Sequence, residues 1–307
     1  MVNYIGIREL HLELEPHCIL NCKHCSSYLL KKAAHCGYTE KDLIALLKEI
    51  DSPVDMFLTG GEPLLFKGLN TFMSNLSSIK PDCSFWIFTT GLLQNDGNLA
   101  PISFEYSKIL HQSGLKGCYV SVYDIMEDGH DYITNYKGSL TLTKQAIQNM
   151  RMAGIDVKLN VVVTKQNYNH LDKIIEMASK WGVSEVRFLK LINHGNAENH
   201  WSELGISESE YKKSILKFFN SSDRHPVNIT ISGYPQIKAC RPYSDAIGCE
   251  AGKQLLYITY SGDVFPCACV KNNQSKRIAH ISETFKIVDF CVSNKDSRVS
   301  CLVNNEE

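Results

Sequence analysis

The sequence predicts an α/β fold: a partial (β/α)6 TIM barrel with a small C-terminal cysteine-rich domain. Strand-like and helix-like apolar patterns alternate up to about residue 191, and six of the segments are strand-like. Such alternation favours a parallel sheet with helices packed outside it. A closed eight-stranded barrel typically takes about 250 residues, so six units ending earlier favour an open one. Six of the twelve cysteines fall between Cys240 and Cys301, which indicates a separate domain there.

The strands and helices of the first part can be placed in order. The first strand is indicated by Leu10, Leu12 and Leu14, which alternate with polar residues. Thr39 is expected to cap a helix whose apolar stripe ends at Ile50. The remaining strands are expected at 54–58, 84–88, 118–123, 157–163 and 185–191, with further helices at 139–152 and 170–180.

The pattern changes after residue 200. Ser207 and Glu210 predict a capping box at the start of a helix. Residues 255–267 predict a β-hairpin with Ser261 and Gly262 at its turn. We therefore expect a barrel domain over residues 1–205 and a second domain, held together by metal, over residues 206–307.

Composition excludes several classes of partner. The net charge of −1 is spread without a basic stripe, so we expect no nucleic-acid partner. Charged residues interrupt the apolar N-terminal positions, so neither a signal peptide nor a membrane span is predicted, and the protein is expected to be cytoplasmic. Twelve cysteines in a reducing compartment favour metal binding or redox chemistry over disulfides.

A C-x-x-x-C-x-x-C loop directly follows the first strand, at Cys18, Cys22 and Cys25. Three thiolates on a short loop can hold three corners of a [4Fe–4S] cluster and leave one iron open to a ligand. The alternative is a structural zinc, which needs four ligands and usually takes them as two separated pairs. His17 and His24 are the candidates for a fourth zinc ligand.

With this loop, the sequence resembles the radical SAM superfamily. The resemblance implies that the open iron binds S-adenosylmethionine (SAM), which is reductively cleaved to a 5′-deoxyadenosyl radical that removes a hydrogen atom from a substrate. The second strand ends in Thr59-Gly60-Gly61-Glu62-Pro63, which resembles the family's GGEP motif. Glycines allow a ligand to approach the backbone, and Glu62 with the glycine carbonyls can accept hydrogen bonds from the methionine ammonium group.

Weaker matches follow in the same order as in the family. By resemblance, Thr90 ends the third strand, Ser121 and Asp124 face the ribose or carboxylate of SAM, and Asn160 faces its ribose. The segment 191–196 is expected to form a loop beside the adenine.

The second domain resembles the SPASM and Twitch auxiliary-cluster domains of the superfamily. Cys249, Gly262 and Cys267 follow the order C-x12-G-x4-C, with the glycine in the hairpin turn. The resemblance implies one auxiliary [4Fe–4S] cluster with Cys249 and Cys267 as its first ligands. The spacing leaves the others open among Cys240, Cys269, Cys291 and Cys301, of which we place Cys291 and Cys301 in the ligand set.

The resemblance predicts a radical SAM enzyme of oxidoreductase or epimerase type that acts on a ribosomally made peptide by oxidation, crosslinking or epimerisation. The alternative substrate is a small metabolite such as an aminoglycoside. Epimerisation needs a thiol that returns a hydrogen atom, and Cys240 is the candidate, ahead of Cys118. A reductant such as flavodoxin or ferredoxin is the expected partner. An alternative from a different class is a non-catalytic iron–sulfur electron-transfer protein.

Overall fold

The computed structural model describes residues 6–33, 35–95, 97–220, 226–231, 251–252 and 254–283. Its main feature is a ten-stranded sheet in the order β12-β11-β10-β1-β2-β3-β6-β7-β8-β9. The six strands predicted from the sequence pair with one another in chain order, and every pair is parallel. They are β1 (Glu9–Glu15), β2 (Val54–Gly60), β3 (Cys83–Thr89), β6 (Leu115–Ser121), β7 (Asp156–Val163) and β8 (Glu185–Lys190).

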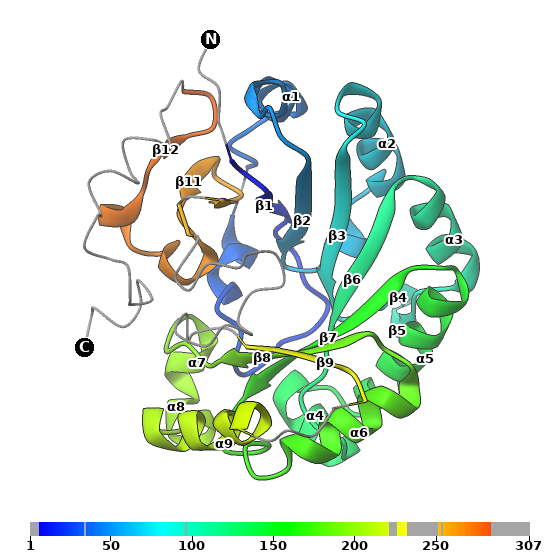
Figure 1. Cartoon of the computed structure of the whole chain (residues 1–307), viewed down its shortest axis with the longest axis vertical. Coiled ribbons are helices and arrows are strands. Elements are labelled where there is room, and N and C mark those ends of the chain that lie inside the picture. Colours follow the sequence, from blue (N-terminus) through cyan, green and yellow to red (C-terminus); the bar gives the residue numbers. More distant parts are fainter. Residues whose placement is uncertain are drawn as a thin grey trace.

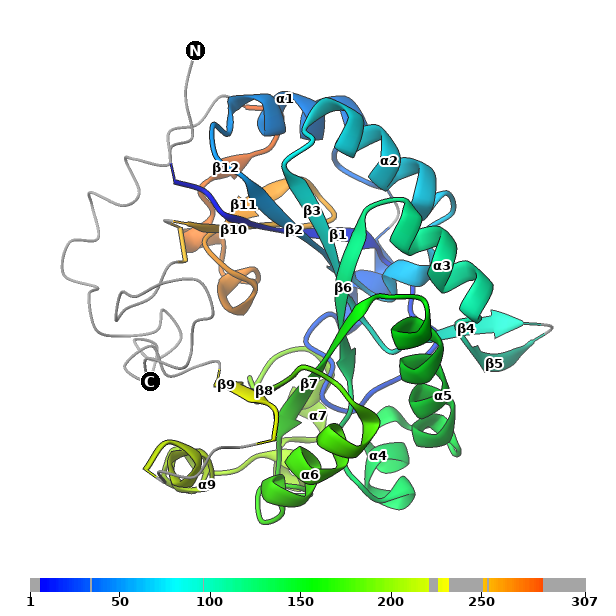
Figure 2. The same ribbon diagram turned by 45° about the vertical axis from the view of Figure 1, so that its right-hand side comes forward.

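Helices cover the outer side of this curved sheet (Figures 1 and 2). They include the predicted helix after Thr39, whose side chain and that of Asp42 form a capping box. In chain order the α-helices are α1 (Glu40–Glu49), α2 (Leu69–Ile79), α3 (Phe104–Gln112), α4 (Glu127–Thr134), α5 (Ser139–Met152) and α6 (Leu171–Trp181). A short 3-10 helix, η2 (Pro63–Leu65), lies between β2 and α2. The fold is therefore α/β with a mostly parallel sheet, as predicted.

Three features lie outside this alternation. A two-stranded hairpin, β4 (Leu92–Asn95) and β5 (Asn98–Pro101), projects from the helical layer (Figure 2). A short 3-10 helix, η1 (Tyr28–Lys32), follows the cysteine loop. The segment after β8 forms α7 (Asn196–Asn199), α8 (Trp201–Leu204) and α9 (Glu208–Asn220), and the capping box predicted for α9 is present, since Ser207 and Glu210 exchange hydrogen bonds.

The later strands extend both edges of the sheet. On one side, β9 (Asn228–Ile231) pairs parallel to β8. On the other, the predicted hairpin is present as β10 (Leu255–Ile258) and β11 (Asp263–Phe265), followed by η4 (Ala268–Val270), η5 (Gln274–Lys276) and β12 (Ala279–His280). The parallel pairing of β10 with β1, Tyr257 opposite His11, was not predicted. The boundary between residues 205 and 206 stays a prediction.

The two faces of the sheet differ in chemistry because side chains alternate along each strand. Leu10, Leu12 and Leu14 point outward into the apolar core beneath the helices. Their neighbours His11 and Glu13 point inward. The inner face also carries aromatic rings and charges from other strands, namely Phe57, Trp86, Phe88, Tyr119, Lys158, Glu185 and Arg187. The concave side therefore carries the charged and aromatic side chains, and a site can form there.

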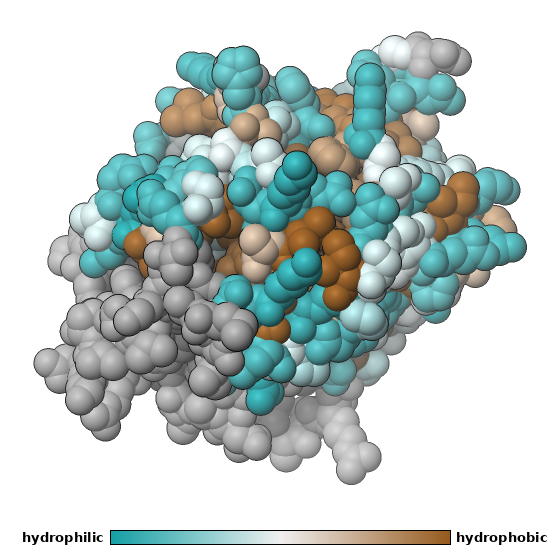
Figure 3. Space-filling view, turned by 90° about the horizontal axis from the view of Figure 1, so that it is seen from above, coloured by the Kyte–Doolittle hydropathy of each residue, from teal (hydrophilic) through white to brown (hydrophobic). Residues whose placement is uncertain are grey.

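The surface is mostly hydrophilic in the view of Figure 3, with apolar residues in separate areas. Within the described part of the chain, every helix is too short or too polar to cross a membrane.

Candidate active site

The three cysteines of the first loop lie together beside the carboxyl end of β1. Cys22 is buried, Cys18 and Cys25 are half-buried, and all three line one cavity of about 510 Å³. Asn196 holds this loop from α7, because its backbone N–H donates to the Cys25 carbonyl (2.9 Å) and its Nδ2 donates to the Cys22 carbonyl (3.0 Å). One residue from a segment distant in the sequence thus holds the loop backbone at two points.

The glycines at the end of β2 allow close packing against the chain that enters the cysteine loop. The Gly61 N–H donates to the Glu15 carbonyl at 2.6 Å, and the Glu62 N–H donates to the His17 carbonyl at 2.7 Å. A Cβ on Gly61 would lie 2.1 Å from the His17 oxygen, and one on Gly60 would lie 2.4 Å from the Glu15 oxygen. The sequence predicted that a ligand approaches the backbone at these glycines, whereas here they accommodate the backbone before Cys18. Both glycines also line the cavity.

Glu62 is fully buried and joins the ends of β2 and β3. Its carboxylate accepts hydrogen bonds from the Thr89 hydroxyl (2.5 Å), the Thr90 hydroxyl (2.7 Å) and the backbone N–H of Thr90 (2.8 Å). Burial raises the pKa of the Glu62 carboxyl, and these hydrogen bonds act in the opposite direction. The turn of Thr89 and Thr90 is therefore attached to the GGEP segment through this side chain.

The other predicted SAM residues divide into two groups. Thr90, Ser121 and Asn160 line the cavity, and the Oδ1 of Asn160 is buried without a hydrogen-bond partner. Pro63 and Asp124 are not among the lining residues. Pro63 begins η2, and Asp124 lies 3.0 Å from Nε2 of His170.

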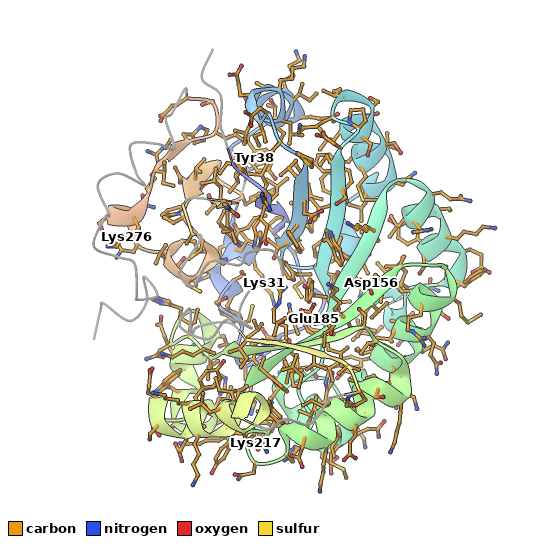
Figure 4. All side chains as sticks on the ribbon, viewed as in Figure 1. Lys31, Tyr38, Asp156, Glu185, Lys217 and Lys276 are labelled. Atoms are coloured by element: carbon orange, nitrogen blue, oxygen red, sulfur yellow. The ribbon has the colours of Figure 1, made fainter. Side chains whose placement is uncertain are left out.

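Burial controls the protonation of the thiols. It raises the pKa of Cys18 to about 12 and that of Cys22 well above the usual range, and the neighbouring thiols add to both effects. Lys31 opposes these shifts from its place near the loop, toward the middle of the view in Figure 4. The thiols therefore hold their protons at neutral pH, and a metal centre must displace those protons to bind.

Two aromatic side chains close the cavity beside the cysteine loop. The ring centroids of His24 and Tyr123 are 4.5 Å apart, and both residues line the cavity together with Cys22 and Ser121. Burial lowers the pKa of His24 to about 4, so the ring is neutral at pH 7, and its Nδ1 has no hydrogen-bond partner in the structure. The sequence left His17 and His24 open as a fourth zinc ligand. Within the described ranges, no three His, Cys, Asp or Glu side chains converge as a single-ion site requires.

Two late cysteines line the same cavity as the first three. Cys267 and Cys269 reach it from the segment after β11, and a hydrogen bond from Cys269 lowers the pKa of Cys267. Four other predicted residues lie outside the described residues, namely Cys240, Cys249, Cys291 and Cys301. Cys118 is fully buried in the outer core, where its thiol lies 3.6 Å from the sulfur of Met150.

Three functional features were missed in the sequence. Lys271 connects the two cysteine groups, since its ammonium donates to the Ser27 hydroxyl at 2.7 Å and pairs with Glu13 at 2.6 Å. Asn196 clamps the loop, and Arg187 lines the cavity from β8. Only Arg187 left a readable signal, because charged residues alternate with apolar ones along its strand.

The fold and this site define an α/β protein whose cysteine loop and GGEP turn share one cavity. The radical SAM superfamily model matches residues 12–178, which is more than half of the chain. The chain therefore belongs to the radical SAM superfamily.

Curated relatives include three different activities. The AdoMet-dependent heme synthase of Nitratidesulfovibrio vulgaris is 23% identical over 301 residues, which cover 89% of this chain and 79% of that protein. The GTP 3′,8-cyclase of Alkaliphilus metalliredigens is 29% identical over 68% of this chain, and the match spans 64% of the cyclase. The PqqA peptide cyclase of Xanthomonas campestris is 22% identical over 83% of this chain and 66% of its own length.

Solved structures show the same fold. Streptococcus suis SuiB bound to its precursor peptide SuiA has a TM-score of 0.64 at 14% identity, over 92% of this chain and 64% of SuiB. Native anSMEcpe with bound AdoMet has a TM-score of 0.65 at 14% identity, over 95% of this chain and 83% of that chain.

Proposed function

We propose that this radical SAM enzyme binds a [4Fe–4S] cluster through Cys18, Cys22 and Cys25 and cleaves SAM reductively in the cavity beside it. The observation that carries the proposal is that these three thiols and the Gly60–Glu62 turn line one cavity. When bound, the cluster would supply an electron and SAM would supply a 5′-deoxyadenosyl radical, which removes a hydrogen atom from the substrate. The thiols suit the cluster because thiolates are its usual protein ligands.

The roles of the SAM-site residues follow from their positions. The Oδ1 of Asn160 is buried without a hydrogen-bond partner. It can therefore accept a hydrogen bond from a ribose hydroxyl of SAM. Gly60, Gly61, Glu62, Thr90 and Ser121 complete the part of the cavity assigned to SAM. Pro63 begins η2 after β2, and Asp124 accepts the backbone N–H of Met126 after β6, so both residues hold the turns that follow their strands.

We further propose that the curved sheet is a partial (β/α)6 barrel and that residues 206–307 form a SPASM/Twitch-like domain with an auxiliary [4Fe–4S] cluster. Support comes from Cys267 and Cys269, which line the same cavity as the first loop. The proposed ligands are Cys249, Cys267, Cys291 and Cys301. A triple Cys18/Cys22/Cys25→Ala variant should keep iron after anaerobic reconstitution, and near-zero iron would contradict the second cluster.

The proposed substrate is a ribosomally made peptide that is oxidised, crosslinked or epimerised, with Cys240 as the thiol that returns a hydrogen atom in an epimerisation. A peptide substrate is supported by the names of two similar proteins, PqqA peptide cyclase and SuiB bound to its precursor peptide. The names of the heme synthase and the GTP cyclase support the small-molecule alternative. Flavodoxin or ferredoxin is the proposed reductant.

Product analysis tests the proposed function. The anaerobically reconstituted protein should form 5′-deoxyadenosine from SAM after addition of dithionite, detected by liquid chromatography with mass spectrometry. Cys22→Ala should abolish it, whereas Cys83→Ala, a buried thiol outside the cavity, should retain it. Equal amounts from wild type and Cys22→Ala would contradict radical chemistry and favour an electron-transfer protein.

A further inference from the structure

A group of buried charges lies on the inner face of the sheet, away from the cysteine loop. Glu185 on β8 is its centre and is 3% exposed. Its Oε1 accepts hydrogen bonds from the hydroxyls of Thr230 (2.7 Å) and Tyr119 (3.3 Å), and its Oε2 accepts one from Lys158 (3.1 Å). Both carboxylate oxygens of Glu185 are thus occupied. Figure 4 shows this residue on the concave side of the sheet.

Arg187 lies two residues further along β8 and on the same face. Its guanidinium lies 4.0 Å from the centroid of the Tyr119 ring and donates a hydrogen bond to the Tyr119 hydroxyl. Its Nε is 3.6 Å from Glu185 Oε1, which is beyond hydrogen-bond range. An arginine has five N–H donors, so in the described structure most donors of Arg187 remain available. The side chain is 17% exposed and lines the cavity, whereas Glu185, Lys158 and Tyr119 do not.

The charges of this group do not balance on the cavity side. Lys158 and Arg187 are both within 4 Å of the single buried carboxylate of Glu185. The other acid near Lys158 is Asp156, at 3.9 Å, and it is 41% exposed and also accepts the Ser184 hydroxyl. The carboxylate of Glu185 is therefore shared between two cations, and the one that faces the cavity is Arg187.

The guanidinium of Arg187 packs over Tyr119, whose register partner Lys158 lies two residues further from the strand ends than Asn160 does. Arg187 itself is the register partner of Asn160, the residue assigned to the SAM ribose. It precedes the end of β8 at Lys190 by three residues, which is about 10 Å along a strand. Leu191 and Ile192, just past that end, line the cavity on the side of the cysteine loop. The cavity wall includes the side chains of Phe88, Tyr257 and Ile231, and it also carries the charged residues Arg8 and Glu9.

We propose that Arg187 binds a carboxylate group of the substrate. The stacked, planar guanidinium can offer two parallel N–H groups to one carboxylate, and the partly enclosed cavity strengthens that interaction. The apolar walls then receive an aliphatic or aromatic part attached to the carboxylate. The inference rests on the proposed function, and it defines the substrate as a carboxylate-bearing molecule whose anionic end points away from the cysteine loop.

Paired probes test the inference on the reconstituted holoenzyme. Anaerobic equilibrium dialysis would compare 3-phenylpropionate with its neutral analogue 3-phenylpropionamide, each with and without SAM. The carboxylate should bind wild type about tenfold more tightly than the amide, since hydrogen bonds to charged groups contribute that much. Arg187→Gln should remove this preference. Arg151→Gln, a matched change at an exposed arginine outside the cavity, should keep it.

Three results would overturn the proposal: equal binding of the two probes by wild type, a preference that persists in Arg187→Gln, or a preference that SAM abolishes. The last would assign Arg187 to the carboxylate of SAM. Iron content and melting temperature would verify folding. If Arg187→Gln does not fold, Arg187→Lys decides, because an ammonium group lacks the planar fork and should reduce the preference severalfold. Formation of 5′-deoxyadenosine by the same wild-type preparation separates failure of this inference from failure of the proposed function.

Discussion

The Lys271 ammonium lies 2.6 Å from Glu13 Oε1, and the side chains are 9% and 3% exposed. Tyr257 also donates its hydroxyl to Glu13 (2.7 Å), and Lys271 donates to Ser27 beside the first cysteine loop (2.7 Å). Because Lys271 follows Cys269 by two residues, this pair connects β1, the first loop and the later cysteines. The two thiol groups are therefore held in one arrangement by a buried ion pair.

Removing the cation of this pair should destabilise the protein strongly. Lys271→Met leaves the Glu13 charge buried without its partner, which typically costs about 3–5 kcal/mol. The double variant with Glu13→Gln should recover part of that loss. Urea unfolding would measure both, with Lys217→Met in the exposed pair with Asp172 as the control, where the expected change is below about 1 kcal/mol. Similar losses in Lys271→Met and Lys217→Met would contradict the structural role.

A side chain at Gly61 should displace the cysteine loop. The Cβ of Gly61→Ala would lie 2.1 Å from the His17 oxygen, so the backbone before Cys18 must move. We expect less iron per chain after reconstitution and a lower melting temperature. Gly68→Ala is the control, since its Cβ meets open space and its positive φ alone costs about 1–2 kcal/mol. Full iron loading of Gly61→Ala would show that the close approach is unimportant.

Loss of the Asn196 clamp should weaken the same loop from the other side. Asn196→Ala leaves the buried Cys22 carbonyl without this donor, which costs about 1–3 kcal/mol. Asn75→Ala, at an exposed asparagine of α2 outside the cavity, provides the control. Iron counting after reconstitution should show a deficit in the first variant alone, and equal iron in both would argue against the clamp.

His130 predicts a loss of stability in acid. Burial lowers its pKa to about 4, and its Nδ1 accepts the backbone N–H of Tyr123, which requires the neutral ring. Between pH 6.5 and 4 the unfolded chain binds more protons at this residue, so the free energy of unfolding falls as pH falls, by about 3 kcal/mol in total. Urea unfolding at several pH values should show that the free energy of unfolding changes less steeply with pH in His130→Gln than in the wild type. An equally steep change in both would contradict the assignment of this pH dependence to His130.

Local patterns predicted the six parallel strands and the capped helices because each depends on neighbouring residues. The parallel pairing of β10 with β1 joins Leu255 to Glu9, residues that are far apart in the sequence, and such a contact leaves no local signal. The hairpin of β4 and β5 was missed although Gly97, with φ +81°, marks its turn.

The site could be predicted only in part. Spacing identified the first cysteine loop and the GGEP turn, and both line the cavity. It did not reveal that the hydrogen bonds of Glu62 go to Thr89 and Thr90, nor that Lys271 would reach Glu13, because those partners meet only in three dimensions.

SAM is expected to bind at the metal centre of the Cys18, Cys22 and Cys25 loop. Electron paramagnetic resonance of the dithionite-reduced protein, recorded with and without SAM, tests it most directly. We predict that SAM changes the g-values of the wild type and of Cys36→Ala, an exposed thiol outside the cavity, and that Cys22→Ala shows no SAM-dependent change. Identical spectra with and without SAM in a fully iron-loaded wild type would contradict the claim.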